Sequence, residues 1–202
     1  MYEVEQKYRL PHPERFLEKV ANVGAFWVKS VTETDTYFQH PMRDFVKTDE
    51  AFRIRWHTTT PRGGRPTTET FLTYKGPKLD PTIKTRQERE LPLLPFGDEA
   101  EFQERWTELL GSLGFRAVRS VHKVREKAYL EWRGFRVELS LDTVESLGRY
   151  AELEILVALQ EELGRAREEI FALAEVLELT DVEPRSYLDL VISADKIKDT
   201  PC

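Results

Sequence analysis

Charged and apolar residues alternate one by one along several segments of the chain, and this pattern limits the possible folds more than any other feature. It is clearest at residues 2–10, 51–58, 69–75, 135–142 and 150–156. Because side chains alternate between the two faces of a β-strand, each segment is predicted to be a strand with one apolar and one charged face. Acidic residues gather on the first and last of these strands, and basic residues on the middle ones.

The rest of the chain predicts three further strands and three helices. Strands are expected at residues 30–38, 85–91 and 117–127. Apolar residues at helical spacing predict helices at residues 13–23, 98–113 and 161–179, the second with Asp98 as its N-cap. Residues 186–192 fit a final short strand or helix. The chain has no repeat and no linker, so residues 1–202 are expected to form a single α+β domain.

Two arrangements of the strands fit the alternation. An antiparallel sheet can keep one face in water and pack the other on helices. A closed antiparallel β-barrel of roughly eight strands would instead turn the charged faces inward, and about three helices would cover its apolar outer face. A solvated face normally mixes Ser, Thr, Lys and Glu, whereas here acids and bases are segregated. The barrel with a charged interior is therefore the predicted fold.

Buried charges need partners or a ligand, because an unpaired charge is costly to remove from water. Converging Lys and Arg side chains beside converging carboxylates suit a polyphosphate together with a divalent cation. The pattern therefore predicts a tunnel that binds a triphosphate.

Charge and composition exclude other classes of protein. A net charge of -6 and a pI near 5.4 argue against a dedicated nucleic-acid-binding protein. No apolar run is long enough to cross a membrane. The amino terminus shows no signal segment, and the only cysteine, Cys202, cannot form an intramolecular disulfide, so a cytoplasmic protein is expected.

The segment Glu3-Val4-Glu5-Gln6-Lys7 resembles the E-x-E-x-K signature of the CYTH superfamily, which groups class IV adenylate cyclases with thiamine and inorganic triphosphatases. Further matching motifs follow in order along nearly the whole chain, at residues 35–38, 53–55, 75–77, 123–125, 142 and 152–154. Residues 35–41, 48–55, 72–78 and 186–190 look most like the class IV adenylate cyclase branch.

The resemblance implies roles for individual residues. The triphosphate-binding positions are Lys7, Arg53, Arg55, Lys75, Lys123 and Arg125. The positions implied to bind a metal, Mg²⁺ or Mn²⁺, are Glu3, Glu5, Asp142, Glu152 and Glu154. The residues implied to be catalytic are Glu5, Glu152, Glu154 and Lys123. Not all cyclases of the branch keep the second acid of the last strand. The presence of Glu154 therefore slightly favours a triphosphatase-like metal site over that of a cyclase.

Three functions stay open at this point. The first is a metal-dependent adenylate cyclase, the second a hydrolase of inorganic, thiamine or nucleoside triphosphates, and the third a polyphosphate or nucleotide sensor without turnover. The full set of acidic positions argues against the sensor. Tyr37, Phe38 and the four tryptophans are expected to pack in the barrel wall, and the four histidines to lie in loops or at the surface. Exposed outer faces of the barrel would suit a homodimer.

Overall fold

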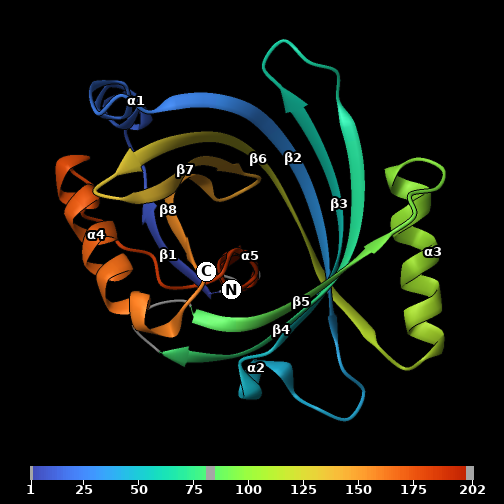
Figure 1. Cartoon of the computed structure of the whole chain (residues 1–202). Coiled ribbons are helices and arrows are strands. Elements are labelled where there is room, and N and C mark those ends of the chain that lie inside the picture. The colour runs from blue at the N-terminus through green and yellow to red at the C-terminus, as the bar shows by residue number, and fades with distance from the viewer. Residues whose placement is uncertain (1, 81–84, 199–202) are drawn as a thin grey trace.

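The computed structural model describes residues 2–80 and 85–198, and an antiparallel sheet of eight strands dominates them (Figure 1). Along the sheet the strands follow the order β1-β8-β7-β6-β2-β3-β4-β5. Their bounds are β1 Tyr2–Arg9, β2 Phe26–Gln39, β3 Ala51–Pro61, β4 Thr67–Asp80, β5 Thr85–Leu93, β6 Arg116–Trp132, β7 Phe135–Val144 and β8 Gly148–Val157. The predicted eight-stranded antiparallel sheet is therefore confirmed.

The sheet curls strongly, but closure into a barrel is not confirmed. The edge strands β1 and β5 approach each other, yet no backbone ladder joins them within the described part of the chain. Register shifts between Lys75 and Asp80 interrupt the pairing of β4 with β5, and such irregularities bend a strand and disturb its ladder locally. Strand β4 was expected to end at residue 75 but runs on to Asp80; residues 81–84 lie outside the described residues.

Helices are more numerous than the three that were predicted. They are α1 Pro13–Asn22, α2 Phe45–Thr48, α3 Glu99–Ser112, α4 Leu163–Val176 and α5 Tyr187–Lys198, with a 3-10 turn η1 at Gln160–Glu162. The predicted cap is present, since the Asp98 side chain accepts a hydrogen bond from the Glu101 backbone at 3.0 Å. No helix of the described residues is long and apolar enough to span a membrane.

The apolar faces of the strands are buried under helices on the convex side of the sheet (Figure 1). Phe16 and Val20 of α1 pack there with Ile170 and Leu173 of α4, against β1, β6, β7 and β8. On the other half of the sheet, Phe102 of α3 packs with apolar residues of β2 and β3. The predicted alternation thus places the charged faces on the concave side. Helix α5 differs, because its first residue, Tyr187, contacts charged side chains of the concave face.

Candidate functional site

A cavity of about 670 Å³ lies on the concave face of the sheet. All six predicted triphosphate-binding cations line it, and they come from four strands: Lys7 of β1, Arg53 and Arg55 of β3, Lys75 of β4, and Lys123 and Arg125 of β6. Three of the predicted acids, Glu3, Glu5 and Glu152, line the same cavity. Each strand delivers its charges to this side because its apolar residues occupy the other face.

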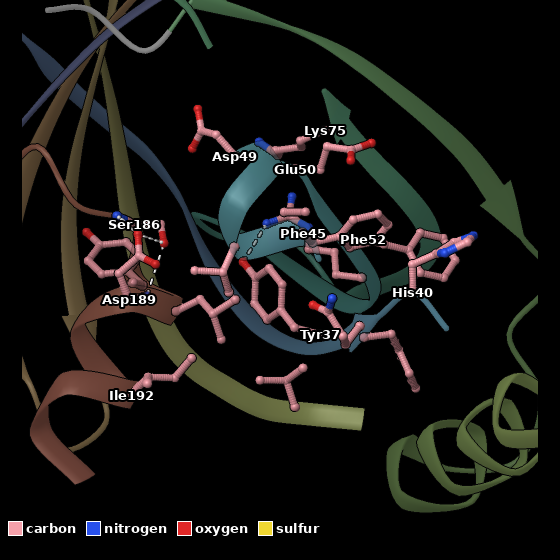
Figure 2. A pocket seen from close by; sticks show the side chains of 18 of the residues that line it. Tyr37, His40, Phe45, Asp49, Glu50, Phe52, Lys75, Ser186, Asp189 and Ile192 are labelled. Carbon is pink, nitrogen blue, oxygen red and sulfur yellow. Dashed lines mark hydrogen bonds between the residues drawn. The ribbon is translucent and has the colours of Figure 1, made fainter. Parts of the chain in front are cut away.

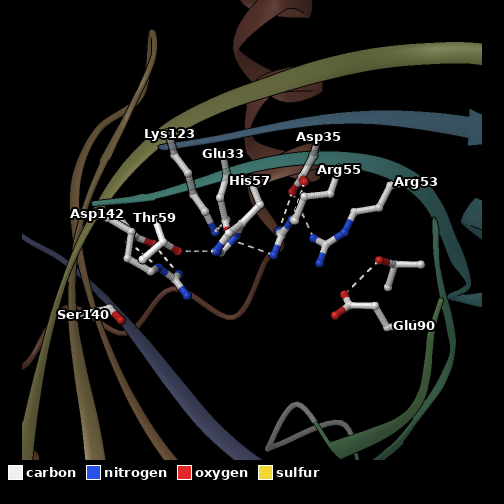
Figure 3. Close-up of polar contacts among 12 residues, drawn as sticks. Glu33, Asp35, Arg53, Arg55, His57, Thr59, Glu90, Lys123, Ser140 and Asp142 are labelled. Carbon is white, nitrogen blue, oxygen red and sulfur yellow. Dashed lines mark hydrogen bonds and ion pairs between the residues drawn. The ribbon is translucent and has the colours of Figure 1, made fainter. Parts of the chain in front are cut away.

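Asp35 of β2 holds the two arginines of β3 in place (Figure 3). Arg55 donates to both of its carboxylate oxygens, at 2.6 and 2.7 Å, and Arg53 donates to Oδ2 at 3.0 Å. Burial alone would raise the pKa of Asp35, but the positive charges of Arg53 and Arg55 overcome it and lower the pKa to about 2. Asp35 is therefore ionised at neutral pH and fixes the direction of both guanidinium groups.

Glu33, two residues earlier on the same face of β2, links Arg55 to two more groups (Figure 3). It forms ion pairs with Arg55 at 2.9 Å and with Lys123 at 2.8 Å, and its Oε1 lies 3.0 Å from His57 Nδ1. Burial opposes ionisation of Glu33, but Lys123 and Arg55 hold its pKa well below the ordinary value. Glu33 and Asp35 together form a row of counter-ions beneath the cations of the cavity.

Asp142 and Glu152, two of the predicted metal-binding residues, lie against a cation in this structure. Both form ion pairs with Arg125, Asp142 through Oδ1 and Oδ2 at 2.6 and 2.5 Å. Tyr187 of α5 also donates to Asp142 Oδ2, at 2.6 Å. Asp142 is fully buried. These contacts make Asp142 a positioning partner of Arg125.

The two lysines at the edges of the sheet are also held by neighbours. The Lys7 ammonium donates to the Arg185 backbone carbonyl at 2.5 Å and stands 4.0 Å from the centre of the Tyr187 ring. Lys75 forms an ion pair with Glu88 of β5 at 2.8 Å. The cations of the cavity are thus fixed in position by groups of the protein itself.

Carboxylates also gather beside this cation cluster, at the junction of β1, β8 and β7. Glu5 lies opposite Glu154 in the pairing of β1 with β8, and Glu154 lies opposite Glu138 in the pairing of β8 with β7. Burial and the charges of Glu138 and Glu5 raise the pKa of Glu154 to about 7. Burial, with the charges of Glu5 and Glu154, raises the pKa of Glu3 well above its ordinary value. These four residues are called the acidic cluster below.

The acidic cluster fits the predicted divalent cation in its chemistry. Carboxylates that repel one another are stabilised by a cation that prefers hard oxygen ligands, such as Mg²⁺ or Mn²⁺. Across residues 2–80 and 85–198, however, no three or more Asp, Glu, His or Cys side chains are already arranged as a ligand set. Holding a metal would therefore require these side chains to turn toward it.

Several residues of the site were missed from sequence. Glu33, Glu88, Glu138 and Tyr187 had no predicted role, and Asp35 was noted only as part of a motif. His57 was expected in a loop or at the surface, which is wrong, because it lies on β3 with its side chain against Glu33. On β2 the charged residues alternate with threonines and not with apolar residues. The strand therefore lacks the charged and apolar alternation by which the other strands were recognised. The spacing of Glu33, Asp35 and Tyr37 by two residues was the available signal.

Comparison with known proteins agrees with the fold. A sequence model of the CYTH domain matches residues 1–187. A Methanocaldococcus jannaschii protein named "putative adenylate cyclase" is 32% identical over 192 residues, which cover 94% of this chain and 98% of that protein.

Solved structures with the same fold include a protein from Pyrococcus horikoshii, which is 40% identical, covers 95% of this chain and 98% of its own, and has a TM-score of 0.78. A Hippeastrum protein that is named for adenylyl cyclase and described as having a dominant triphosphatase activity is 17% identical and covers 95% of both chains, with a TM-score of 0.61. At 17% identity, the likeness to the Hippeastrum protein concerns the fold alone.

Proposed function

Because this chain belongs to the CYTH domain family, we propose that it is a metal-dependent enzyme acting on a triphosphate, and that its reaction converts ATP to cyclic AMP and pyrophosphate. The observation that carries the proposal is the convergence of six cationic side chains from four strands on one cavity. Many charges of one sign in one cavity suit a ligand of the opposite sign, and a triphosphate carries several negative charges on a compact chain.

The cations would bind and orient the triphosphate. Arg53, Arg55 and Arg125 offer forked donors that match phosphate oxygens, while the lysines act as point charges. Their counter-ions hold them in place before substrate arrives, so little reorganisation is needed on binding. Phosphoryl transfer depends mostly on such positioning and on stabilisation of charge.

Glu3, Glu5 and Glu154 of the acidic cluster would hold the divalent cation, since Glu3 and Glu5 line the cavity and all three carboxylates repel one another. The metal, when bound, would neutralise charge on the phosphate oxygens. Glu5, Glu152, Glu154 and Lys123 are proposed as catalytic residues. Lys123 and Glu152 both line the cavity, so they can contact the substrate directly.

In the proposed reaction the ribose 3′-oxygen bonds to the α-phosphorus and loses its proton to a base. The bond from that phosphorus to the α–β bridging oxygen breaks, and pyrophosphate leaves with the electron pair. Lysine and arginine side chains beside the leaving group would stabilise the charge that develops on it.

Hydrolysis of a triphosphate is the second candidate reaction. It is favoured by Glu154, which adds a carboxylate to the acidic cluster, and by the dominant triphosphatase activity described for the Hippeastrum protein of the same fold. The same cations would then hold the phosphates while water attacks the terminal one.

Product analysis separates these reactions. The protein is incubated with ATP, tripolyphosphate or thiamine triphosphate under Mg²⁺ or Mn²⁺. Cyclic AMP and pyrophosphate from ATP are the expected products. Inorganic phosphate from tripolyphosphate without cyclic AMP from ATP would replace the cyclase by the hydrolase, and no turnover of any substrate would refute both. Arg55→Ala should abolish turnover, whereas Arg105→Ala, at an exposed position on α3, should not change it.

A further inference from the structure

The cavity has a second end at which apolar and aromatic side chains gather among polar ones (Figure 2). One wall is the segment of residues 40–50, which contains α2 and is called the strap below. The opposite wall is α5. Apolar and aromatic side chains line this end: Tyr37, Phe45, Val46, Val118, Leu188 and Ile192. It is continuous with the cation cluster, so a single ligand can occupy both.

The strap is held rigidly by Glu50. Its Oε1 accepts hydrogen bonds from Arg43 at 2.8 Å and from the Tyr74 hydroxyl, and its Oε2 accepts one from Thr48 at 2.6 Å. His40 Nδ1 accepts from the backbone nitrogens of Met42 and Arg43 at 3.0 and 3.1 Å. These contacts fix the strap as a wall with a defined shape, and a preformed wall lowers the entropic cost of binding a ligand.

A β-bulge contributes to the same wall. In the pairing of β2 with β6, Tyr37 lies opposite Arg119 and Phe38 lies opposite Ala117, so Val118 is an extra residue without a partner position. Bulges turn a side chain away from the ordinary alternation of a strand. Here the bulged residue lines the cavity.

Apolar side chains stay open to solvent at this end. Val46, on α2, is 84% exposed although it lines the cavity. An exposed apolar side chain is unremarkable alone, but one that lines a cavity beside aromatic rings suits contact with an apolar ligand. The cavity volume also falls within the range of roughly 300–1,000 Å³ that is typical for pockets holding an organic ligand.

We propose that the strap and α5 form the subsite for the base of a nucleoside triphosphate, whose phosphates bind the cation cluster. This inference rests on the proposed function and adds the organic group that the site selects. A planar base can contact the Tyr37 ring while Val46, Leu188 and Ile192 enclose it.

The charges at this end do not favour the cationic ring of thiamine over a neutral base, since the acids Asp44, Asp49, Glu50 and Asp189 lie beside the cations Arg43 and Arg116. Asp44 caps α2 by accepting from the Val46 backbone at 3.2 Å, and Asp189 accepts from Ser186 at 2.6 Å. The Glu50 carboxylate already accepts hydrogen bonds from Arg43, Thr48 and Tyr74. Arg43 and Arg116 also line the cavity, so its charge does not single out a cation.

Calorimetry with three probes tests the subsite. 3′-Deoxy-ATP keeps the base and the triphosphate but lacks the attacking hydroxyl, tripolyphosphate lacks the organic group, and thiamine triphosphate carries the cationic ring. Titrations are made with a chelator present, which blocks the metal-dependent turnover. The wild-type protein should bind 3′-deoxy-ATP more tightly than the other two.

Val46→Asn and Ile192→Asn should each weaken binding of 3′-deoxy-ATP by about tenfold, the scale of one lost apolar contact. Binding of tripolyphosphate should change by less than twofold. Leu94→Asn is the matched control, because Leu94 is 89% exposed and is not among the residues that line the cavity. Circular dichroism checks that each variant folds.

Equal weakening for 3′-deoxy-ATP and tripolyphosphate, or no weakening of either, would overturn the subsite. A selective loss for thiamine triphosphate would overturn its assignment to a nucleobase. If wild-type protein binds tripolyphosphate as tightly as 3′-deoxy-ATP, the subsite is refuted and the proposed action on triphosphates stands. If it binds none of the three probes, that proposed function fails as well.

Discussion

Arg125 and Asp142 form a two-point ion pair, in which Arg125 Nε donates to Oδ1 at 2.6 Å and Nη2 donates to Oδ2 at 2.5 Å. Because Tyr187 donates to the same carboxylate, this pair joins the cavity to α5. Asp142 thus has two effects: it orients a cation of the cavity, and it anchors the helix that forms one wall of the apolar end.

Asp142→Asn should destabilise the protein by about 3 kcal/mol, because it leaves the buried Arg125 without its full counter-charge. Urea denaturation measures the change. Asp195→Asn is the control: it removes a carboxylate that pairs with Arg119 at the surface, at 3.1 Å, and should cost less than about 1 kcal/mol. Equal stability losses in the two variants would contradict the assigned importance of the buried pair.

Asp35→Asn should weaken tripolyphosphate binding by about tenfold or more, since Arg53 and Arg55 lose the charge that orients them. Tyr37→Phe removes only a single hydroxyl contact with Arg53, at 3.3 Å, and should weaken binding by less than about threefold. Calorimetry gives both dissociation constants. If Asp35→Asn bound tripolyphosphate as tightly as the wild type, Asp35 would not be a positioning residue.

Glu154→Gln should raise the melting temperature in a chelating buffer, because it removes repulsion from Glu138 and Glu5. Added Mg²⁺ or Mn²⁺ should stabilise the wild-type protein, since a ligand that binds only the folded state shifts the unfolding equilibrium. The variant should gain less from the metal. An equal metal-induced shift in both proteins would remove Glu154 from the metal site without any assay of activity.

Stability should fall in acid as Glu183 is protonated. Hydrogen bonding from Arg185, helped by Arg9, lowers the pKa of Glu183 from 4.5 to about 2. A carboxyl whose pKa is depressed by folding stabilises the native state fully above its unfolded pKa. This contribution is lost as the pH falls from about 4.5 to about 2. The stability difference between wild type and Glu183→Gln should therefore be largest at neutral pH and shrink across that range; a difference independent of pH would contradict the assignment.

The alternation of charged and apolar residues was enough to predict the strands, their antiparallel sheet and the face on which the charges meet. It succeeded because period two is imposed by the backbone of a strand, whatever the tertiary contacts. Glu3, Glu5 and Lys7 show this most clearly, since the intervening Val4 is buried in the core.

Sequence could not reveal which charges neutralise one another. The pairing of Asp35 with Arg55 depends on the register of β2 against β3, and that register is set by the whole sheet. The strap was missed because α2 spans only Phe45–Thr48, too short to show helical periodicity. Tyr37 was expected to pack in the wall, yet it lines the cavity, since its strand carries no apolar alternation that would assign its face.

The pairing of β1 with β8 has a consequence for how the protein folds. Lys7 at the start of the chain lies opposite Glu152, and its backbone carbonyl accepts from the nitrogen of Glu183. The strand partners of β1 are therefore synthesised more than a hundred residues after it. As a result, the cation cluster cannot assemble step by step while the chain is being made on the ribosome. Such long-range pairing carries a high loop-closure entropy, and folding on the scale of milliseconds to seconds is expected. Until β8 and the segment around Glu183 are made, the edge of β1 is open to pairing with another chain.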